Sequence, residues 1–141
     1  MLNSDAPRVS FRVMTWNIEG FKRNVFNLRE LIKIETPAIV FLSETQIFSS
    51  DIGRLMTYFQ GEYSFYGNTD DCFDLDLPLV KSCASGGTIT MWRKDLDPFI
   101  TVYPPPSPAI LPIIFHPQGC SLSIHVNVYL PTQGHETEFM A

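Results

Sequence analysis

The sequence predicts an α+β fold in which a mixed β-sheet carries two helices and the second half of the chain is rich in strands. Phe11, Val13 and Thr15 alternate with other side chains over residues 10–17, which is typical of a strand. Apolar residues then recur at helical spacing over 25–34, and the unbroken apolar run A-I-V-F-L at 38–42 is typical of a strand covered on both faces. A strand, a helix and a strand in this order predict two parallel, adjacent strands.

The ends of these first elements place two polar side chains together. Asn24 can cap the helix, and Thr36-Pro37 ends it because the residue before a proline disfavours helical backbone. Asn17 and Glu44 follow the two strands. Since parallel strands end at one edge of the sheet, both residues should emerge where open sheets flanked by helices place their ligands.

The remaining elements follow from local patterns. A short helix is expected over 50–59, a third strand over 62–67, and an acidic loop over 68–78 that is better explained by solvation than by calcium binding. Strands at 86–93 and 99–103 should form an antiparallel hairpin. The proline-rich run at 103–112 suits a stiff surface connection, or else a polyproline ligand. Strands at 111–116 and 121–130 flank a P-Q-G turn.

Length and composition indicate one globular domain at 10–141, preceded by a flexible N-terminus at 1–9. The net charge of -5 excludes a broad electrostatic attraction to nucleic acid or anionic membrane, so any contact with DNA would be local. The sequence shows neither a secretory signal nor a membrane span, which predicts an intracellular protein without a membrane partner. Cys72, Cys83 and Cys120 lack metal or disulfide spacing and are expected to be free thiols.

Four short motifs occur in an informative order. They are W-N at 16–17, S-E-T at 43–45, G-G-T at 86–88 and Y-L-P at 129–131. Together they resemble the endonuclease/exonuclease/phosphatase superfamily. The segments D-C-F-D-L-D-L-P-L, S-G-G-T-I-T-M-W-R-K, L-P-I-I-F and Y-L-P-T-Q-G further resemble the endonuclease domains of LINE-type (non-long-terminal-repeat) retrotransposons, over about 11–139.

This resemblance implies a four-layer α/β/β/α sandwich with helices outside, and a Mg²⁺-dependent phosphodiesterase that nicks DNA, in the nucleus if the endonuclease interpretation holds. It implies that Glu44 ligates Mg²⁺, which prefers oxygen ligands. Asn17 would join the same metal cluster with a neutral amide, and Tyr129 would place its hydroxyl against the phosphate. Without the resemblance these three are a strand-end carboxylate, a turn residue and an edge aromatic. Trp16 is expected in the core, and Glu19 in a turn without a role.

The sequence also departs from the superfamily pattern. Ser43 stands where many members have Gln, and Thr132 where many have Asn. The chain ends at Ala141, before the G-D-x-N and S-D-H motifs that would supply further metal ligands and the catalytic pair. None of His116, His125 and His135 is assigned to catalysis.

These departures predict an N-terminal portion of the domain at 10–141, with the second half of the fold missing. Such a chain should bind Mg²⁺ weakly, be inactive as a nuclease, and self-associate through an uncovered sheet. Two alternatives remain open. One is a fragment of a phosphatase or lipid phosphodiesterase of the same superfamily, and the other is a non-catalytic fragment that binds nucleic acid or protein.

Overall fold

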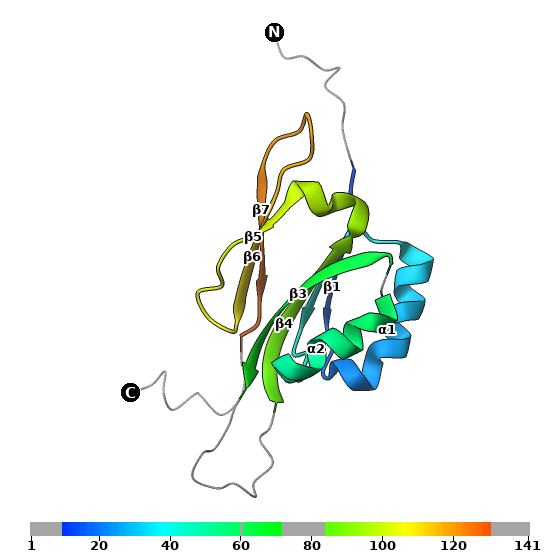
Figure 1. The fold of residues 1–141 in the computed structure, drawn as a ribbon, viewed down its shortest axis with the longest axis vertical. Coiled ribbons are helices and arrows are strands. Elements are labelled where there is room, and N and C mark those ends of the chain that lie inside the picture. Colours follow the sequence, from blue (N-terminus) through cyan, green and yellow to red (C-terminus); the bar gives the residue numbers. More distant parts are fainter. Residues whose placement is uncertain (1–9, 60, 72–83, 131–141) are drawn as a thin grey trace, which may run out of the picture.

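The computed structural model describes residues 10–59, 61–71 and 84–130, and in these residues two β-sheets pack face to face (Figure 1). The first sheet has the order β1-β2-β4-β3, and the second has the order β5-β6-β7. Two helices cover the outer face of the first sheet, which makes three layers, helix, sheet and sheet. The α+β fold class is therefore confirmed. The predictions for residues 1–9 and 131–141 lie outside the described residues.

The first strand, helix and second strand form as predicted. β1 (Val13–Asn17) pairs in parallel with β2 (Ile39–Ser43), and the register places Asn17 opposite Ser43. Between them, α1 (Phe21–Glu35) buries the stripe of Phe21, Val25, Leu28 and Ile32 against the sheet. This stripe follows the 3.6-residue period of an amphipathic helix. The apolar run of β2 is buried throughout from Ile39 to Leu42, as expected for a strand covered on both faces.

The predicted cap of α1 is wrong. The helix begins at Phe21, and its N-cap is Gly20, which adopts the positive φ of 107°. Asn24 lies one turn inside the helix, where its Nδ2 donates to the carbonyls of Ile18 at 2.7 Å and Gly20 at 3.2 Å. The asparagine therefore lies in the first turn of the helix, but it does not cap it. Its side-chain amide connects the helix to the loop that precedes it. The predicted end is confirmed, because α1 stops before Thr36-Pro37.

The next two elements extend the first sheet. α2 (Ser49–Met56) and a 3₁₀ turn at Thr57–Phe59 form the second predicted helix, and β3 (Tyr63–Asp71) forms the third predicted strand. β3 is longer than predicted, so the start of the acidic segment belongs to a strand with an irregular register near Asn68. The rest of that segment lies outside the described residues, and its predicted solvation is untested.

The predicted hairpin between 86–93 and 99–103 is wrong. β4 (Ala84–Arg93) pairs with β2 and β3, whereas β5 (Ile100–Val102) begins the second sheet. A 3₁₀ helix at Lys94–Phe99 separates the two strands. Its Leu96 is buried between the sheets, and Trp92 Nε1 donates to Asp97 Oδ1 at 2.7 Å. These contacts turn the chain from one sheet into the other.

The second sheet continues with β6 (Ile110–Phe115) and β7 (Ser123–Val128), which pair antiparallel as the P-Q-G turn predicts. That turn closes with a bond from the Cys120 N–H to the Pro117 carbonyl at 3.1 Å. Cys120 is a free thiol, and the other two cysteines lie outside the described residues. No helix in the described part of the chain is long and apolar enough to cross a membrane.

The two faces of the second sheet differ sharply. Its inner face packs on the first sheet through Phe41, Ile113 and Phe115. Its outer face leaves Ile124 and Val126 exposed, at 62% and 50% of their surface. Among the described residues no helix covers this outer face (Figure 1).

Candidate active site

Glu44 sits just beyond the end of β2 in a backbone conformation that a non-glycine residue seldom adopts, with a φ of 51°. Backbone bonds hold this segment on both sides. The Gly20 N–H donates to the Glu44 carbonyl at 2.9 Å, and the Gln46 N–H donates to the Gly86 carbonyl at 2.9 Å. Residues held in such sparsely populated conformations cost about 1–3 kcal/mol and cluster at functional sites. The surrounding loops therefore fix the backbone at Glu44.

Tyr129 reaches the same place from the second sheet. It follows β7, and its N–H donates to the Ala109 carbonyl at 2.8 Å. Its hydroxyl lies near Glu44, and burial together with Glu44 raises the pKa of Tyr129. Its ring packs against Gly86, where a Cβ would lie only 3.0 Å from the Tyr129 Cε1 atom. The glycine motif thus lets the tyrosine ring approach, and residues of the S-E-T and G-G-T motifs lie next to each other and to Tyr129.

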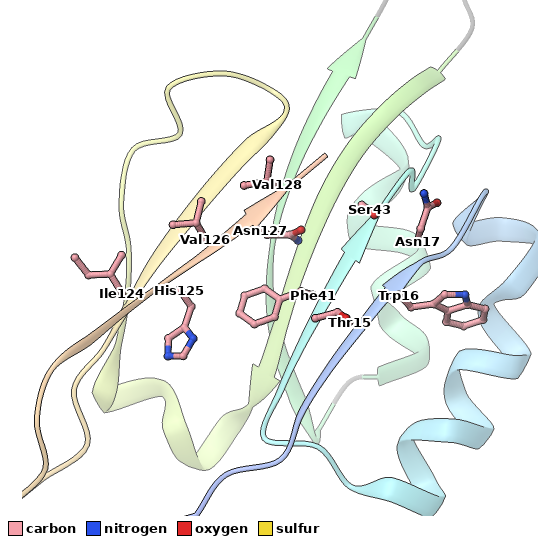
Figure 2. A pocket seen from close by; sticks show the side chains of 10 residues that line it. All are labelled: Thr15, Trp16, Asn17, Phe41, Ser43, Ile124, His125, Val126, Asn127 and Val128. Carbon is pink, nitrogen blue, oxygen red and sulfur yellow. The ribbon is translucent and has the colours of Figure 1, made fainter. Parts of the chain in front are cut away.

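Asn17 lies on the neighbouring strand at the same edge of the first sheet, as the parallel pairing predicts. Its side chain is exposed and borders a cavity of about 560 Å³ between the first sheet and β7 (Figure 2). Trp16, which precedes it, packs half-buried against the core under the helices. At this edge Glu44 influences the pKa of Tyr129, and Asn17 pairs with Ser43, the residue before Glu44.

Asn127 is a site-bordering residue that the sequence did not single out. Its buried Nδ2 donates to the carbonyls of Leu42 at 3.0 Å and Ile89 at 3.2 Å, and lies 3.4 Å from the Thr90 hydroxyl. These bonds connect the second sheet to the first. Their acceptors lie near the site, because Leu42 in β2 is two residues before Glu44 and Ile89 in β4 is two residues after Gly87. The available signal was a lone asparagine in the apolar strand I-H-V-N-V, two residues before Tyr129.

The side-chain oxygen atoms at this edge are of the types that bind a hard divalent cation. The Glu44 carboxylate and the Asn17 amide oxygen are ligand types that Mg²⁺ accepts, with water in the remaining positions. Within the described residues, however, no group of three or more His, Cys, Asp or Glu side chains could hold a metal ion. His125 lies between the sheets, where its Nε2 is 2.9 Å from the Ser123 hydroxyl. The described residues therefore supply oxygen atoms of a suitable type without a cluster of three such side chains.

We expect the influence of Glu44 on Tyr129 to be visible in a pH titration. The pKa of Tyr129 is raised above its ordinary value of 10.0, first by burial and then by the hydrogen bond and charge of Glu44. A pKa raised on folding stabilises the folded chain below the unfolded value, and that stability is lost as pH rises through the folded value. Tyrosinate absorbance should therefore show Tyr129 ionising late, and Glu44→Gln should bring the pKa back toward 10.0.

The control for this titration is the Tyr129→Phe variant, whose spectrum is subtracted. Subtraction is needed because burial also raises the pKa of Tyr63, whose hydroxyl donates to the Pro37 carbonyl at 2.6 Å. An identical Tyr129 titration in wild type and Glu44→Gln would show that the two side chains do not interact.

Known structures share this arrangement of elements. No protein-family model and no curated protein sequence matches the chain. The AP endonuclease LMAP from Leishmania major superposes with a TM-score of 0.65 at 19% identity, over 92% of this chain and 43% of that protein. The 3′ phosphatase NExo from Neisseria, bound to a product DNA hairpin, superposes with a TM-score of 0.55 at 14% identity, over 85% of this chain and 41% of that protein.

At this level of identity the comparisons show the fold. The chain spans less than half the length of either solved protein. Both neighbours have folds of the endonuclease/exonuclease/phosphatase type, which is the fold that the resemblance of the four motifs implies. The described residues therefore form part of an endonuclease/exonuclease/phosphatase-type fold.

Proposed function

We propose that this chain is part of a Mg²⁺-dependent phosphodiesterase domain that nicks DNA, of the kind encoded by LINE-type retrotransposons. One observation carries the proposal. Tyr129 and Glu44, which are far apart in the sequence and follow strands of different sheets, lie close enough at the sheet edge beside Asn17 for Glu44 to raise the pKa of Tyr129. The two solved neighbours are named as enzymes that act on DNA, which supports DNA as the substrate class.

The proposed roles follow from the chemistry of each side chain. Glu44, with Asn17 beside it, would hold Mg²⁺ through oxygen atoms. The ion would supply charge stabilisation on the scissile phosphate. Tyr129 is protonated at neutral pH, since the ordinary pKa of a tyrosine is 10.0 and this one is raised, so its hydroxyl can donate to a phosphate oxygen as negative charge develops there.

We further propose that the 141-residue chain is not a competent nuclease by itself. Hydrolysis needs a positioned water, a general base and a stabilised leaving group. In the described residues the site contains Glu44 as its carboxylate, and that group is assigned to the metal. A single carboxylate should bind Mg²⁺ weakly, because the ion gives up its water reluctantly.

A plasmid-nicking assay with Mg²⁺ tests both statements. It compares the 141-residue chain with the same chain extended by the sequence encoded downstream, each with and without Glu44→Gln. We expect the extended chain to nick and to lose about 10²-fold or more of its rate on Glu44→Gln, since groups at the transition state are typically worth that much. Nicking by the short chain that depends on Glu44 would contradict inactivity. An extended chain that is unaffected by Glu44→Gln would contradict the proposed site.

A second function is favoured by the Neisseria neighbour, which is named as a 3′ phosphatase. The same assay series, repeated with DNA that carries a 3′-phosphate, distinguishes an endonuclease from a 3′ phosphatase. Release of phosphate without nicking would replace the endonuclease proposal by the phosphatase alternative. Binding of DNA without either reaction would favour the non-catalytic alternative.

We also propose that two chains associate through the outer face of the second sheet, where Ile124, Val126 and Val128 are exposed. Light scattering should then show a mass that rises with concentration, and Ile124→Lys should keep the chain monomeric. A constant monomeric mass for the wild type would contradict this association.

A further inference from the structure

The proline segment, residues 103–106 between β5 and β6, consists of Tyr103 and three prolines (Figure 1). A proline ring holds its φ at about −65°, and a residue before a proline is pushed to extended backbone. Every residue from Tyr103 to Pro105 precedes a proline. Together these restrictions favour a polyproline II helix, which has about three residues per turn and no internal hydrogen bonds. In agreement, residues 103–106 lie in neither a helix nor a strand.

The exposure of the proline segment follows this three-residue period. Tyr103 and Pro106 lie three positions apart, so they share one face of the helix, and Pro104 lies on a second face. All three are exposed, and Tyr103 exposes 58% of its surface. Pro105, on the third face, is half-buried. The segment therefore rests on the protein along one face and presents the other two faces to solvent.

Hydrogen bonds hold both ends of the proline segment. The Tyr103 N–H donates to the Pro112 carbonyl at 3.1 Å, which ties the first residue to β6. Ser107 follows the segment, and its carbonyl accepts from Asn68 Nδ2 in β3 at 2.7 Å and from the Ile110 N–H at 3.2 Å. The segment is thus held in an extended shape before any partner arrives. Such preorganisation lowers the conformational entropy that binding costs.

The proline segment cannot serve as an edge for further strands of the domain. Pro104, Pro105 and Pro106 carry no N–H, so a strand beside them would lack the donors of a β-ladder. The length of the loop is also not needed to join β5 to β6. About 2–5 residues commonly connect antiparallel neighbours, whereas residues 103–109 separate these two strands. Recognition of the segment must therefore act through its rings and carbonyl groups.

The composition around the proline segment defines the chemistry of a partner. Residues 98–115 contain no Asp, Glu, Lys or Arg. A nucleic acid or an acidic membrane surface therefore finds no cation to bind here. The exposed groups are a phenol ring and proline rings. Rigid proline-rich segments of this kind dock in grooves that are lined by aromatic side chains.

We propose that the proline segment is a docking site for a protein domain whose groove is lined by aromatic side chains. The faces that carry Tyr103, Pro104 and Pro106 enter the groove, and the face of Pro105 stays against this chain. The proline rings fill the spaces between the aromatic side chains of the partner, and the Tyr103 ring packs at one end. This docking does not involve Glu44, so it is independent of the proposed nuclease activity.

Titration of the ¹⁵N-labelled chain with isolated SH3, WW and EVH1 domains tests the proposal, because these domains bind proline-rich segments in aromatic-lined grooves. At least one domain should produce saturable NMR shifts at the amides of Tyr103 and Ser107. Tyr103→Ala and Pro106→Ala should each weaken that binding about tenfold, since each removes a ring from the docked faces. Pro108→Ala is the matched control, because this exposed proline lies beyond the segment, and it should change binding less than about twofold.

The amide of Tyr103, which the Pro112 carbonyl protects from hydrogen exchange, reports whether the loop keeps its shape in the two proline variants. Equal binding by Pro106→Ala and Pro108→Ala, with this amide protected in both, would contradict the proposed docking. The absence of shifts with all three domains would overturn it as well. So would binding of a domain to the isolated peptide 101–109 but not to the folded chain, or loss of binding when the chain is extended by the sequence encoded downstream. In either case other residues of the same chain would cover the segment.

Discussion

Gly87→Ala is expected to destabilise the folded chain by about 2–3 kcal/mol and to displace Glu44. Gly87 has a φ of 88°, which is strained for any residue with a Cβ, and that Cβ would lie 2.7 Å from the Thr45 hydroxyl oxygen. Thr45 is buried, and its N–H bonds to the Gly87 carbonyl at 3.3 Å. The collision therefore pushes on the residue next to Glu44. Urea unfolding and the Tyr129 titration would measure the two effects.

Two further variants separate the backbone strain at Gly87 from the collision with Thr45. Gly53→Ala is the matched control, because Gly53 lies in α2 with no heavy atom within 4 Å of its Cβ position, and it should stabilise the chain by about 0.5–1 kcal/mol. In a Thr45→Ala background the steric part of the Gly87→Ala cost should disappear and the backbone strain should remain. A Gly87→Ala cost equal in both backgrounds would contradict the proposed contact with Thr45.

Asn127→Leu is expected to cost about 1–3 kcal/mol, although the substitution makes a buried strand more apolar. The reason is that the Leu42 and Ile89 carbonyls would lose a donor inside the interface between the sheets. Thermal or urea unfolding would measure the change. Asn17→Leu is the control, because Asn17 is exposed at the end of β1 and should change stability by less than about 0.5 kcal/mol.

An equal loss of stability in Asn127→Leu and Asn17→Leu would contradict the role of Asn127 in holding the sheets together. Asn127→Asp extends the comparison. Its carboxylate would face two carbonyl oxygens at neutral pH, so it should destabilise the chain more than Asn127→Leu does.

Local sequence patterns predicted those parts of the fold that depend on neighbours in the chain. The alternation over 10–17, the helical spacing from Val25 to Ile32 and the apolar run at 38–42 were sufficient to predict β1, α1 and β2 as a parallel unit. The partners of β4 were not predictable in this way. Its alternating pattern fits any antiparallel neighbour, and only the buried Leu96 and the bond from Trp92 to Asp97 show that the chain leaves the sheet.

The candidate site likewise contains residues whose positions local patterns predicted and residues whose positions they did not. The common edge of Asn17 and Glu44 followed from the parallel strands, whereas the approach of Tyr129 required the resemblance of the motif order to a known superfamily. Asn127 was missed because a single polar residue in an apolar strand is ambiguous until its partners are known. The roles of Asn17, Glu44 and Tyr129 in metal and phosphate binding stay predictions.

A Mg²⁺ titration of the ¹⁵N-labelled chain, followed by NMR, tests most directly whether this sheet edge is the ligand half of a phosphodiesterase site. We predict saturable shifts at the amides of Asn17, Glu44 and Tyr129, with a dissociation constant on the order of millimolar because the site has one carboxylate. Glu44→Gln should abolish these shifts, and Glu19→Gln, an exposed turn variant near Asn17, should preserve them. Equal shifts in wild type and Glu44→Gln, or none at these three residues, would contradict the account.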